Sequence, residues 1–521
     1  MKKNTRFALA AFIILSLLLA ACSNSGGKSG SDEQPPESGK GNGNASEQTG
    51  EKQPAKHTFT MLTETHPSWP FNKDWPIWSM IEGFTGATFD IQLPSGNLED
   101  TLNLTISSGN MPDLMYMGNR VMANKYGQQG ALANILDYVD VMPNFKKWME
   151  QYPEITRAQL AADGKMYMFP NEGFGETNRM IWMYREDIFK KHGLEVPATY
   201  DDLYQVLKQL KELYPKSSPF SFRFGPNLEI LRNLAAQYGT NQGYYMDGDM
   251  VKYGPTEESF RKLTEYLSLF YKDGLMPPDW LTVDTKKWQD LMSTDQSFIT
   301  LDYIGRIDFF NSAMRKDNPD YTIAFMAPPI GMPGVKSQNE YTHVVDSGLT
   351  ASANSKQLTE VMKMMDFFYS EEGRNMASWG EEGVTYTMQD GKKKFNSSFT
   401  ELSELRKQTG LATNGTYTWI DYDAHLSLAS EELQKTYELA RQHDAVYRPK
   451  AELNEEELEI NSTVGAAVEK YKNEQLTKFI LGDKDLSQWD DYIDGLKKLG
   501  LQQILDIHQA AFERSAQVQL K

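Results

Sequence analysis

Aromatic and polar residues that together could hold a flat ligand rich in hydroxyl groups are concentrated in one short stretch. Residues 64–78 read ETHPSWPFNKDWPIW, with three tryptophans, three prolines and one histidine. Aromatic faces pack against the apolar CH faces of a sugar ring, and planar polar groups pair with its hydroxyls. We therefore select Trp69 and Trp75 for stacking, with Glu64 and His66 as polar partners. Their alternative role is to cover the core.

Most other candidates of the same kind follow predicted strands or lie in loops, whereas Asn178 and Trp182 lie within a predicted strand. They are Asn119, Asn178, Trp182, Arg223, Tyr303, Arg306, Trp379, Glu381, Tyr386, Trp419 and Asp421. Their positions suit binding because ligands of open α/β sheets bind where the carboxyl ends of the strands meet a crevice. The alternative for the arginines is a salt bridge at the surface or near a hinge, and for the aromatic residues it is the core.

The sequence offers no comparable case for catalysis. Neither G-x-S-x-G nor H-E-x-x-H occurs, and no cysteine–histidine spacing suits a metal. Glu381 and Glu382 are adjacent, whereas the two carboxylates of a glycosidase face each other across the scissile bond. A secreted glycoside hydrolase remains an alternative because distant carboxylate pairs are not visible in a sequence. We expect no enzyme activity, no cofactor and no metal.

The single cysteine, Cys22, ends a segment typical of protein export. Lys2, Lys3 and Arg6 give a positive start, and residues 7–21 are apolar apart from one serine. A charged start, a short apolar stretch and small residues before the cut form a secretory signal. The stretch is too short for a membrane span of about 20 residues, which argues against a transmembrane helix.

Small residues followed by Cys22 resemble the lipobox of bacterial lipoproteins. The resemblance implies that a diacylglycerol is added to the cysteine sulfur and that the signal peptide, residues 1–21, is removed. Residues 22–56 are rich in Gly, Ser, Pro, Glu, Gln and Lys, so we predict a disordered linker. The folded part is then expected on the extracellular face of the cell membrane, held by its lipid.

Composition limits the remaining classes of partner. The chain has 521 residues and a formal net charge of −18. An acidic protein repels phosphate backbones and anionic lipid headgroups, so we expect no nucleic-acid partner and expect the lipid to do the anchoring. With its one cysteine used for the lipid, no disulfide is available. The residues after the linker suffice for two domains held together by burial.

Strand and helix patterns alternate from His57 onward. We predict strands at residues 58–63, 87–93, 113–116, 178–184, 298–301, 322–326 and 344–349. We predict helices at residues 74–84, 98–107, 185–192, 199–213 and 257–273, and a helical chain from about residue 421 to the end. This alternation predicts an α/β fold with parallel sheets and right-handed crossovers.

Six stretches are together similar to one protein family. They are SGNMPDLMYM at 108–117, DGKMYMFP at 163–170, MYREDIFKKHGLEVPATYDDL at 183–203, LFYKDGLMPPDW at 269–280, MKMMDFFYSEEGRNMASWGEEGVTYT at 362–387 and YKNEQLTKFILGDKDLSQWDDYIDGLKKLGL at 471–501. In this order, after a lipobox and a linker, they resemble the extracellular solute-binding lipoproteins of ABC sugar importers. The large oligosaccharide-binding members are the most similar.

The resemblance implies the two-lobe fold of periplasmic binding proteins, with a ligand crevice between the lobes and a helical C-terminal region. We expect residues 57–175 and 325–375 to form the first lobe. Residues 176–324 and 376–521 would then form the second. Lobes of this kind close around a ligand by hinge motion.

The resemblance also implies the partners: an oligosaccharide, the membrane subunits of an ABC permease, and the membrane through the lipid on Cys22. We expect a monomer. A peptide or another non-sugar solute is the alternative ligand, since peptides also bind aromatic surfaces. Larger members often carry a calcium loop after the helix that matches residues 199–213. Here residues 214–219 read YPKSSP, without a carboxylate, so we predict no calcium there.

Overall fold

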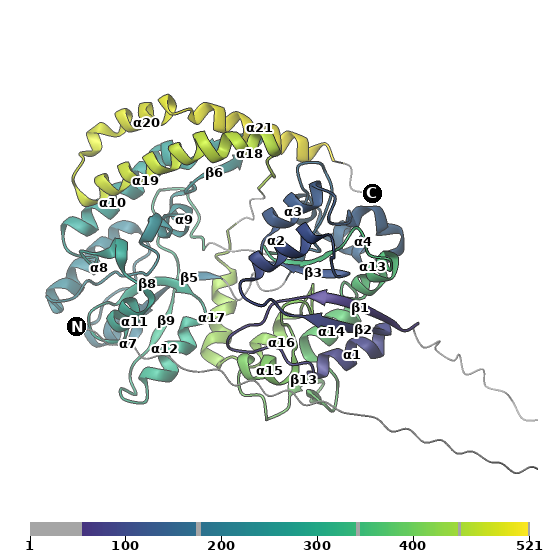
Figure 1. Ribbon diagram of the computed structural model, residues 1–521. Helices are drawn as coiled ribbons and strands as arrows, with labels where there is room; N and C mark the ends of the chain where they lie inside the picture. The colour runs from purple at the N-terminus through teal and green to yellow at the C-terminus, as the bar shows by residue number, and fades with distance from the viewer. Residues whose placement is uncertain (1–54, 173–178, 340–343, 446–449, 519–521) are drawn as a thin grey trace, which may run out of the picture. The chain divides into compact units, whose positions relative to one another are not determined.

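The computed structural model describes residues 55–172, 179–339, 344–445 and 450–518 (Figure 1). The predicted signal peptide, Cys22, almost all of the predicted linker and Asn178 lie outside these ranges. Within them, no helix combines the length and the apolar character that crossing a membrane requires.

A four-stranded sheet forms the centre of the first region, with the order β11–β3–β1–β2. The strands are β1 (His57–Leu62), β2 (Ala87–Gln92), β3 (Leu114–Met117) and β11 (Gly348–Ala351). β1 pairs in parallel with β2 and β3, as the alternation of strands and helices predicts. β11 returns late in the chain and runs antiparallel to β3. β2 is therefore an edge strand.

Short helices pack around this sheet, and local signals explain where several begin and end. They are α1 (Pro76–Thr85), α2 (Leu98–Ser108), α3 (Arg120–Gln128), α4 (Pro143–Gln151), α5 (Pro153–Ala158), α13 (Leu358–Phe367), α14 (Glu371–Trp379), α15 (Leu402–Thr409) and α16 (Tyr422–Leu426). The side chain of Asn97 caps α2 by accepting from the N–H of Glu99 at 2.7 Å. α1 has proline at its first position and ends at Gly86, whose φ of 71° favours glycine.

A three-stranded sheet, β8–β5–β9, forms the centre of the second region. Its strands are β5 (Met180–Arg185), β8 (Ile299–Tyr303) and β9 (Ile323–Met326). Both neighbours run antiparallel to β5, so the prediction of parallel sheets is wrong here. Alternating strands and helices do not fix the direction in which a returning strand enters a sheet, because long connections can close either way.

Helices dominate the rest of the second region. They are α7 (Glu186–His192), α8 (Tyr200–Leu213), α9 (Ile230–Ala235), α10 (Glu258–Lys272), α11 (Thr285–Ser293), α12 (Arg306–Met314), α17 (Glu431–Arg441), α18 (Glu455–Ile460), α19 (Ala466–Leu481), α20 (Trp489–Lys498) and α21 (Leu501–Ala516). α19 packs on α10, and α21 packs on β7 (Met250–Tyr253), the partner of β6 (Tyr244–Asp247) (Figure 1). The predicted helical C-terminal region is thereby confirmed.

Each region has its own apolar core. Phe59 and Trp148 lie in the core around the first sheet. Trp182 and Phe270 lie in a core of the second region, to which the C-terminal helices add Phe479. These separate cores fit the predicted two-lobe organisation.

The stretch 376–424 packs differently from our expectation. Its side chains Trp379, Tyr386, Leu405 and Trp419 belong to the core of the first sheet. The predicted lobe boundaries place this stretch in the second lobe, but its apolar side chains pack with the first. The chain enters the second region after β4 (Asn171–Glu172) and returns at β10 (Val344–Val345), and these two strands pair with each other.

Candidate ligand-binding site

The chain leaves the first sheet at the carboxyl end of β1, where Glu64 follows. The carboxylate of Glu64 accepts a hydrogen bond from the side-chain amide of Asn414. The hydroxyl of Thr63 donates to the backbone carbonyl of Asn414 at 3.3 Å. Burial raises the pKa of Glu64, and the hydrogen bond from Asn414 opposes this rise. A partly buried carboxyl group thus lies at the end of β1, able to accept from a ligand hydroxyl.

Three planar side chains stack beside this carboxyl group. The ring centroids of His66 and Trp69 lie 3.7 Å apart, with 7° between the ring planes. The guanidinium carbon of Arg406 lies 4.7 Å from the ring centroid of Trp69. Burial lowers the pKa of Arg406 to about 10, so this side chain remains charged at neutral pH. The predicted residues Glu64, His66 and Trp69 do come together, with Arg406 beside them.

A narrow cavity lies among these residues. It is lined by Glu64, His66, Trp69, Phe71, Trp75, Trp78, Thr413 and Asn414. Its volume of about 10 Å³ leaves room for about one water molecule. A ligand at this place therefore needs the lining side chains to move or must lie on their exposed surfaces.

Trp75, selected for stacking, instead fills the core. Its side chain is buried, and its indole N–H donates to the backbone carbonyl of Lys407 at 2.8 Å. Gly410 follows α15 with a φ of 73°, and a Cβ there would lie 2.6 Å from the Trp75 ring. The backbone at residue 410 therefore lies close against the tryptophan ring, and only glycine allows this approach.

Candidates from the end of α14 onward form a packed aromatic cluster. Trp379 is only 5% exposed and stacks on Phe395 with ring centroids 4.8 Å apart. Its indole N–H donates to a carboxylate oxygen of Asp421 at 2.8 Å, and the edge of Tyr386 packs against it. The structure thus brings Trp379, Tyr386 and Asp421 together, but the two rings present little surface to a ligand.

The two remaining candidates of this stretch differ in exposure. Trp419 is 9% exposed and lies beneath Arg374, whose guanidinium carbon is 4.7 Å from its ring centroid. Glu381 is exposed. Of these two residues, only Glu381 is open to solvent.

A second polar cluster forms around Asp302, at the end of β8. The buried carboxylate of Asp302 accepts hydrogen bonds from Arg223 at 2.6 and 3.1 Å and from Nε of Arg306 at 3.1 Å. It also accepts from the backbone N–H of Tyr303 at 2.8 Å. The predicted residues Arg223, Tyr303 and Arg306 therefore come together through one shared carboxylate.

Aromatic rings accompany this cluster. Tyr303 is 36% exposed, and its ring meets the edge of Phe224 with centroids 6.0 Å apart. The guanidinium carbon of Arg223 lies 4.4 Å from the ring centroid of Phe224. Guanidinium groups beside partly exposed aromatic rings combine hydrogen-bond donors with an apolar surface, the pairing expected for sugar recognition.

Three candidates remain, namely Trp182, Asn119 and Asn178. Trp182 is fully buried and stacks on Phe220 with centroids 5.4 Å apart, so its role is in the core and not at a ligand surface. Asn119 caps α3 by accepting from the N–H of Met122 at 2.8 Å. Asn178 lies outside the described residues.

The sequence alone does not indicate Arg406 and Asn414 as candidate site residues. Arg406 belongs to α15, a polar helix in which a basic residue normally points to solvent, and no local pattern indicates its burial. Asn414 precedes a glycine, which is a turn signal, but its contact with Glu64 joins residues 350 positions apart. Phe224 was missed as well, because a single phenylalanine carries no signal of exposure.

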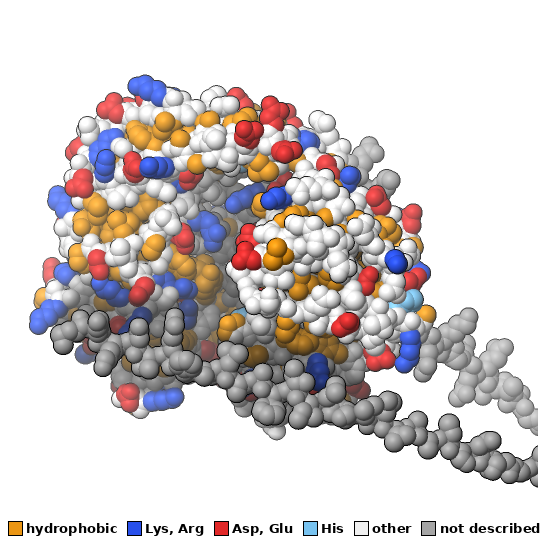
Figure 2. Space-filling view, in the orientation of Figure 1, with side chains coloured by type: hydrophobic (Ala, Val, Ile, Leu, Met, Phe, Trp, Pro, Cys, Tyr) orange, Lys and Arg blue, Asp and Glu red, His pale blue; other side chains and the backbone are white. Residues whose placement is uncertain are grey.

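Surface charge and metal-ligating groups add two observations. On the face shown in Figure 2, basic and acidic side chains are interspersed, and basic and hydrophobic side chains lie at the wall of a central hollow. In the described part of the chain, no three or more His, Cys, Asp or Glu side chains are grouped to hold a metal ion.

The stability of this region should depend on pH through His425. This side chain is fully buried, and burial together with the charge of Arg406 lowers its pKa well below the usual 6.5. As the pH falls below 6.5, the unfolded chain binds a proton there that the folded chain does not, so the free energy of unfolding should fall. A single group can contribute up to about 1.4 kcal/mol per pH unit.

Urea unfolding of wild-type protein and of His425→Gln between pH 7.5 and pH 5 would test this expectation. Glutamine does not titrate, so the variant should lose less stability per pH unit over the acidic part of the range. Equal pH dependence of the two proteins would show that His425 binds its proton equally in both states. His443, a half-buried histidine just after α17, provides the control variant His443→Gln.

Comparison with known proteins finds that the chain is similar to one protein family. The family model described as bacterial extracellular solute-binding protein matches residues 78–375, more than half of the chain. Two curated relatives cover most of the sequence. One is the fructooligosaccharide ABC transporter substrate-binding protein FusA of Streptococcus pneumoniae, 24% identical over 88% of this chain and 90% of FusA. The other is lipoprotein LipO of Bacillus subtilis, 24% identical over 83% of this chain and 88% of LipO.

A solved structure agrees with the fold. The alginate-binding protein AlgQ2, in a crystal structure without calcium, superposes with a TM-score of 0.68 and is 25% identical. The match covers 88% of this chain and 98% of AlgQ2. The similarity thus extends over nearly all of the described residues.

Proposed function

Because the chain belongs to the family of bacterial extracellular solute-binding proteins, we propose that it captures an oligosaccharide outside the cell and delivers it to an ABC-type permease. The observation that carries this proposal is the chemistry of the two clusters at strand ends. One combines Glu64, Trp69 and Arg406. The other combines Asp302 with Tyr303 and two arginines. Each supplies an aromatic surface with hydrogen-bonding groups beside it.

We propose that the two clusters form opposite walls of the ligand crevice. Each cluster belongs to a region with its own core, so the regions can move as lobes. A ligand that binds the closed form better than the open form shifts the population toward closure. No step of this cycle requires bond cleavage, and we propose that the chain is not an enzyme.

We further propose that the mature protein begins at Cys22 and is anchored through lipid on its sulfur to the extracellular face of the membrane, as a monomer. The charged start, apolar stretch and small residues before Cys22 support this, as does the similarity to lipoprotein LipO. Metabolic labelling with a radioactive fatty acid would test it. Label should be incorporated into the wild type and be absent from Cys22→Ala.

Thermal unfolding in the presence of candidate ligands tests the function. A ligand at 100 times its dissociation constant should add about 2.7 kcal/mol to the stability of the protein. Fructooligosaccharides and oligosaccharides prepared from alginate are natural first choices, because FusA is named for the first and AlgQ2 for alginate. Peptides serve as controls. A shift by peptides alone would contradict the sugar proposal, and release of shorter sugars on incubation would contradict the absence of catalysis.

Replacing Trp69 by alanine should weaken oligosaccharide binding by roughly 1–3 kcal/mol, which corresponds to about 5- to 150-fold in affinity. The expected cause is loss of an aromatic surface at the end of β1. Isothermal titration calorimetry with the oligosaccharide that gives the largest thermal shift measures the change. Phe84, an exposed aromatic residue at the far end of α1, provides the matched variant Phe84→Ala, which should bind normally. Unchanged affinity in Trp69→Ala would show that this cluster is not part of the ligand-binding site.

A further inference from the structure

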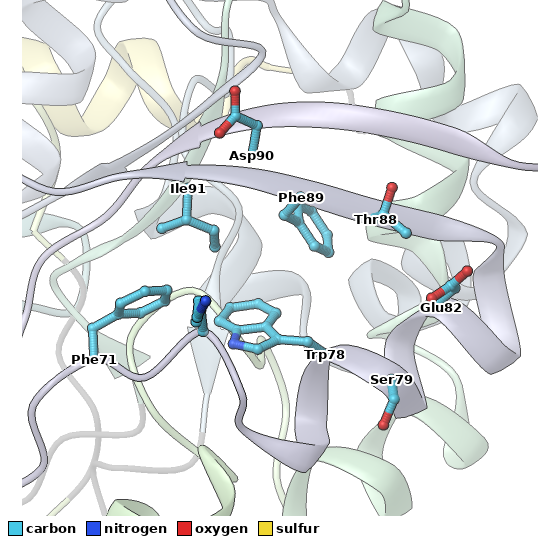
Figure 3. A pocket seen from close by; sticks show the side chains of 9 residues that line it. Phe71, Trp78, Ser79, Glu82, Thr88, Phe89, Asp90 and Ile91 are labelled. Atoms are coloured by element: carbon cyan, nitrogen blue, oxygen red, sulfur yellow. The ribbon is translucent and has the colours of Figure 1, made fainter.

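We infer that a cavity beside β2 is a second carbohydrate subsite, which accepts the outer sugar rings of an oligosaccharide whose inner rings bind near Trp69. The cavity has a volume of about 430 Å³ and lies between α1, the segment before it and β2 (Figure 3). This volume is within the roughly 300–1,000 Å³ typical of small-molecule sites. The inference rests on the proposed function, because it extends the same ligand.

Half-buried aromatic rings form the inner surface of the cavity. The ring of Trp78 lies 6.1 Å from that of Phe71 and 5.7 Å from that of Phe89, measured between centroids. Figure 3 shows Phe89 and Ile91 pointing from β2 toward Trp78, while neighbouring polar side chains of the strand point away. The indole N–H of Trp78 donates to the carbonyl of residue 72 at 3.2 Å, which fixes the orientation of the ring. A fixed aromatic face suits the apolar face of a sugar.

Charged groups stand at the rim of the cavity. Lys73 is exposed and lines it beside Trp78. Glu82 also lines it and pairs with Lys56 at 3.2 Å, and the side chains of Lys56 and Glu82 are 80% and 40% exposed. Exposed ion pairs contribute little free energy, so Glu82 can exchange the ammonium group for a sugar hydroxyl. The rim thus supplies both a donor and an acceptor.

These rings pack against the first core but are only partly covered by it. Ile77, Met80 and Ile81 are the buried side chains of α1, whereas Trp78 stays half-buried on another side of the helix. Because β2 is an edge strand, Phe89 is also only partly covered. Contiguous exposed apolar surface on a soluble protein commonly marks a binding site.

Continuity with the proposed crevice favours a sugar over a protein partner. Phe71 and Trp78 line this cavity and also the narrow cavity that contains Glu64 and Trp69. One aromatic surface therefore extends from the end of β1 to the edge of β2. A ligand bound at Trp69 and long enough to continue along this surface reaches Phe89.

The test uses variants of residues that line the outer cavity and not the narrow cavity near Trp69. Phe89→Ala removes a ring of the cavity, and Lys73→Ala removes an exposed rim group whose loss should not disturb the fold. Calorimetry would compare a trisaccharide with an octasaccharide of the same linkage, in the fructooligosaccharide and alginate series. We expect wild type to bind the octasaccharide more tightly, Phe89→Ala to lose about tenfold for the octasaccharide alone, and Lys73→Ala to lose a few-fold.

Other outcomes would overturn the inference in distinct ways. Equal losses for both lengths, or no loss for either, would exclude a separate outer subsite. If the variants bind both sugars normally but bind the permease less tightly, the cavity serves a protein partner. If wild type binds neither series, the proposed function fails for these sugars and the subsite fails with it. Thermal midpoints of Phe89→Ala and of the control Phe84→Ala show whether the fold is retained.

Discussion

Replacing Asp302 by alanine is expected to lower the free energy of unfolding by roughly 2–4 kcal/mol and to reduce ligand affinity at least tenfold. Asp302 is fully buried and accepts hydrogen bonds from both Arg223 and Arg306. Removing one partner of a fully buried ion pair costs about 3–5 kcal/mol. We expect somewhat less because the two arginine side chains keep 15% and 22% of their exposure. Affinity should fall because neither guanidinium group is then held in place.

Urea unfolding and calorimetry would measure the two effects on the same preparations. Asp302→Asn keeps the shape and should fall between wild type and alanine. Asp317, exposed just after α12, provides the control variant Asp317→Ala, which should behave like wild type. If Asp302→Ala loses stability but binds the ligand normally, the cluster is structural, and the wall of the crevice lies elsewhere.

Replacing Trp379 by alanine should destabilise the protein by about 3–5 kcal/mol, the usual cost of emptying the space of a large buried side chain. Its ring is almost completely enclosed, stacks on Phe395 and donates to Asp421. From the sequence alone, this residue would be expected to act on binding. The structure shifts the expected effect to stability, with any change in affinity secondary.

Comparison of Trp379→Ala with Trp69→Ala separates packing from binding. Trp69 is partly exposed, so its loss should weaken binding with a smaller loss of stability. Trp379→Phe should recover part of the stability, because it retains an aromatic ring against Phe395 but not the indole donor. The opposite pattern, in which Trp379→Ala is stable but binds the ligand weakly, would show that Trp379 acts in ligand binding.

Much of the first sheet could be predicted because its signals are local. The strand 87–93 and the helix 98–107 were predicted to within about a residue of β2 and α2. Gly86 stops α1, and Asn97 caps α2, through interactions among near neighbours in the chain. Such signals depend on a few consecutive residues, so they survive in any tertiary context.

Properties set by distant contacts could not be predicted. β5 pairs antiparallel with β8 and β9, and no pattern within β5 specifies that direction. Residues 376–424 return to the first region because their apolar side chains fit that core, a matter of shape and not of periodicity.

The candidate site was predictable only in part, for the same reason. Glu64, His66 and Trp69 are near neighbours in one loop, and the structure keeps them together. Trp75 and Trp182 look like binding residues in a sequence, because neighbouring residues do not show whether an aromatic ring is exposed or enclosed.

The late return of residues 376–424 to the first region also sets the order in which the protein can fold. As the chain is synthesised from its N-terminus, Trp75 meets no backbone from Gly410 until more than three hundred further residues have followed. Contacts this distant in sequence form slowly, because a long loop must close first. The core of the first region therefore stays incomplete until most of the chain has been synthesised. Such a chain stays unfolded longer, which suits passage across a membrane before folding begins.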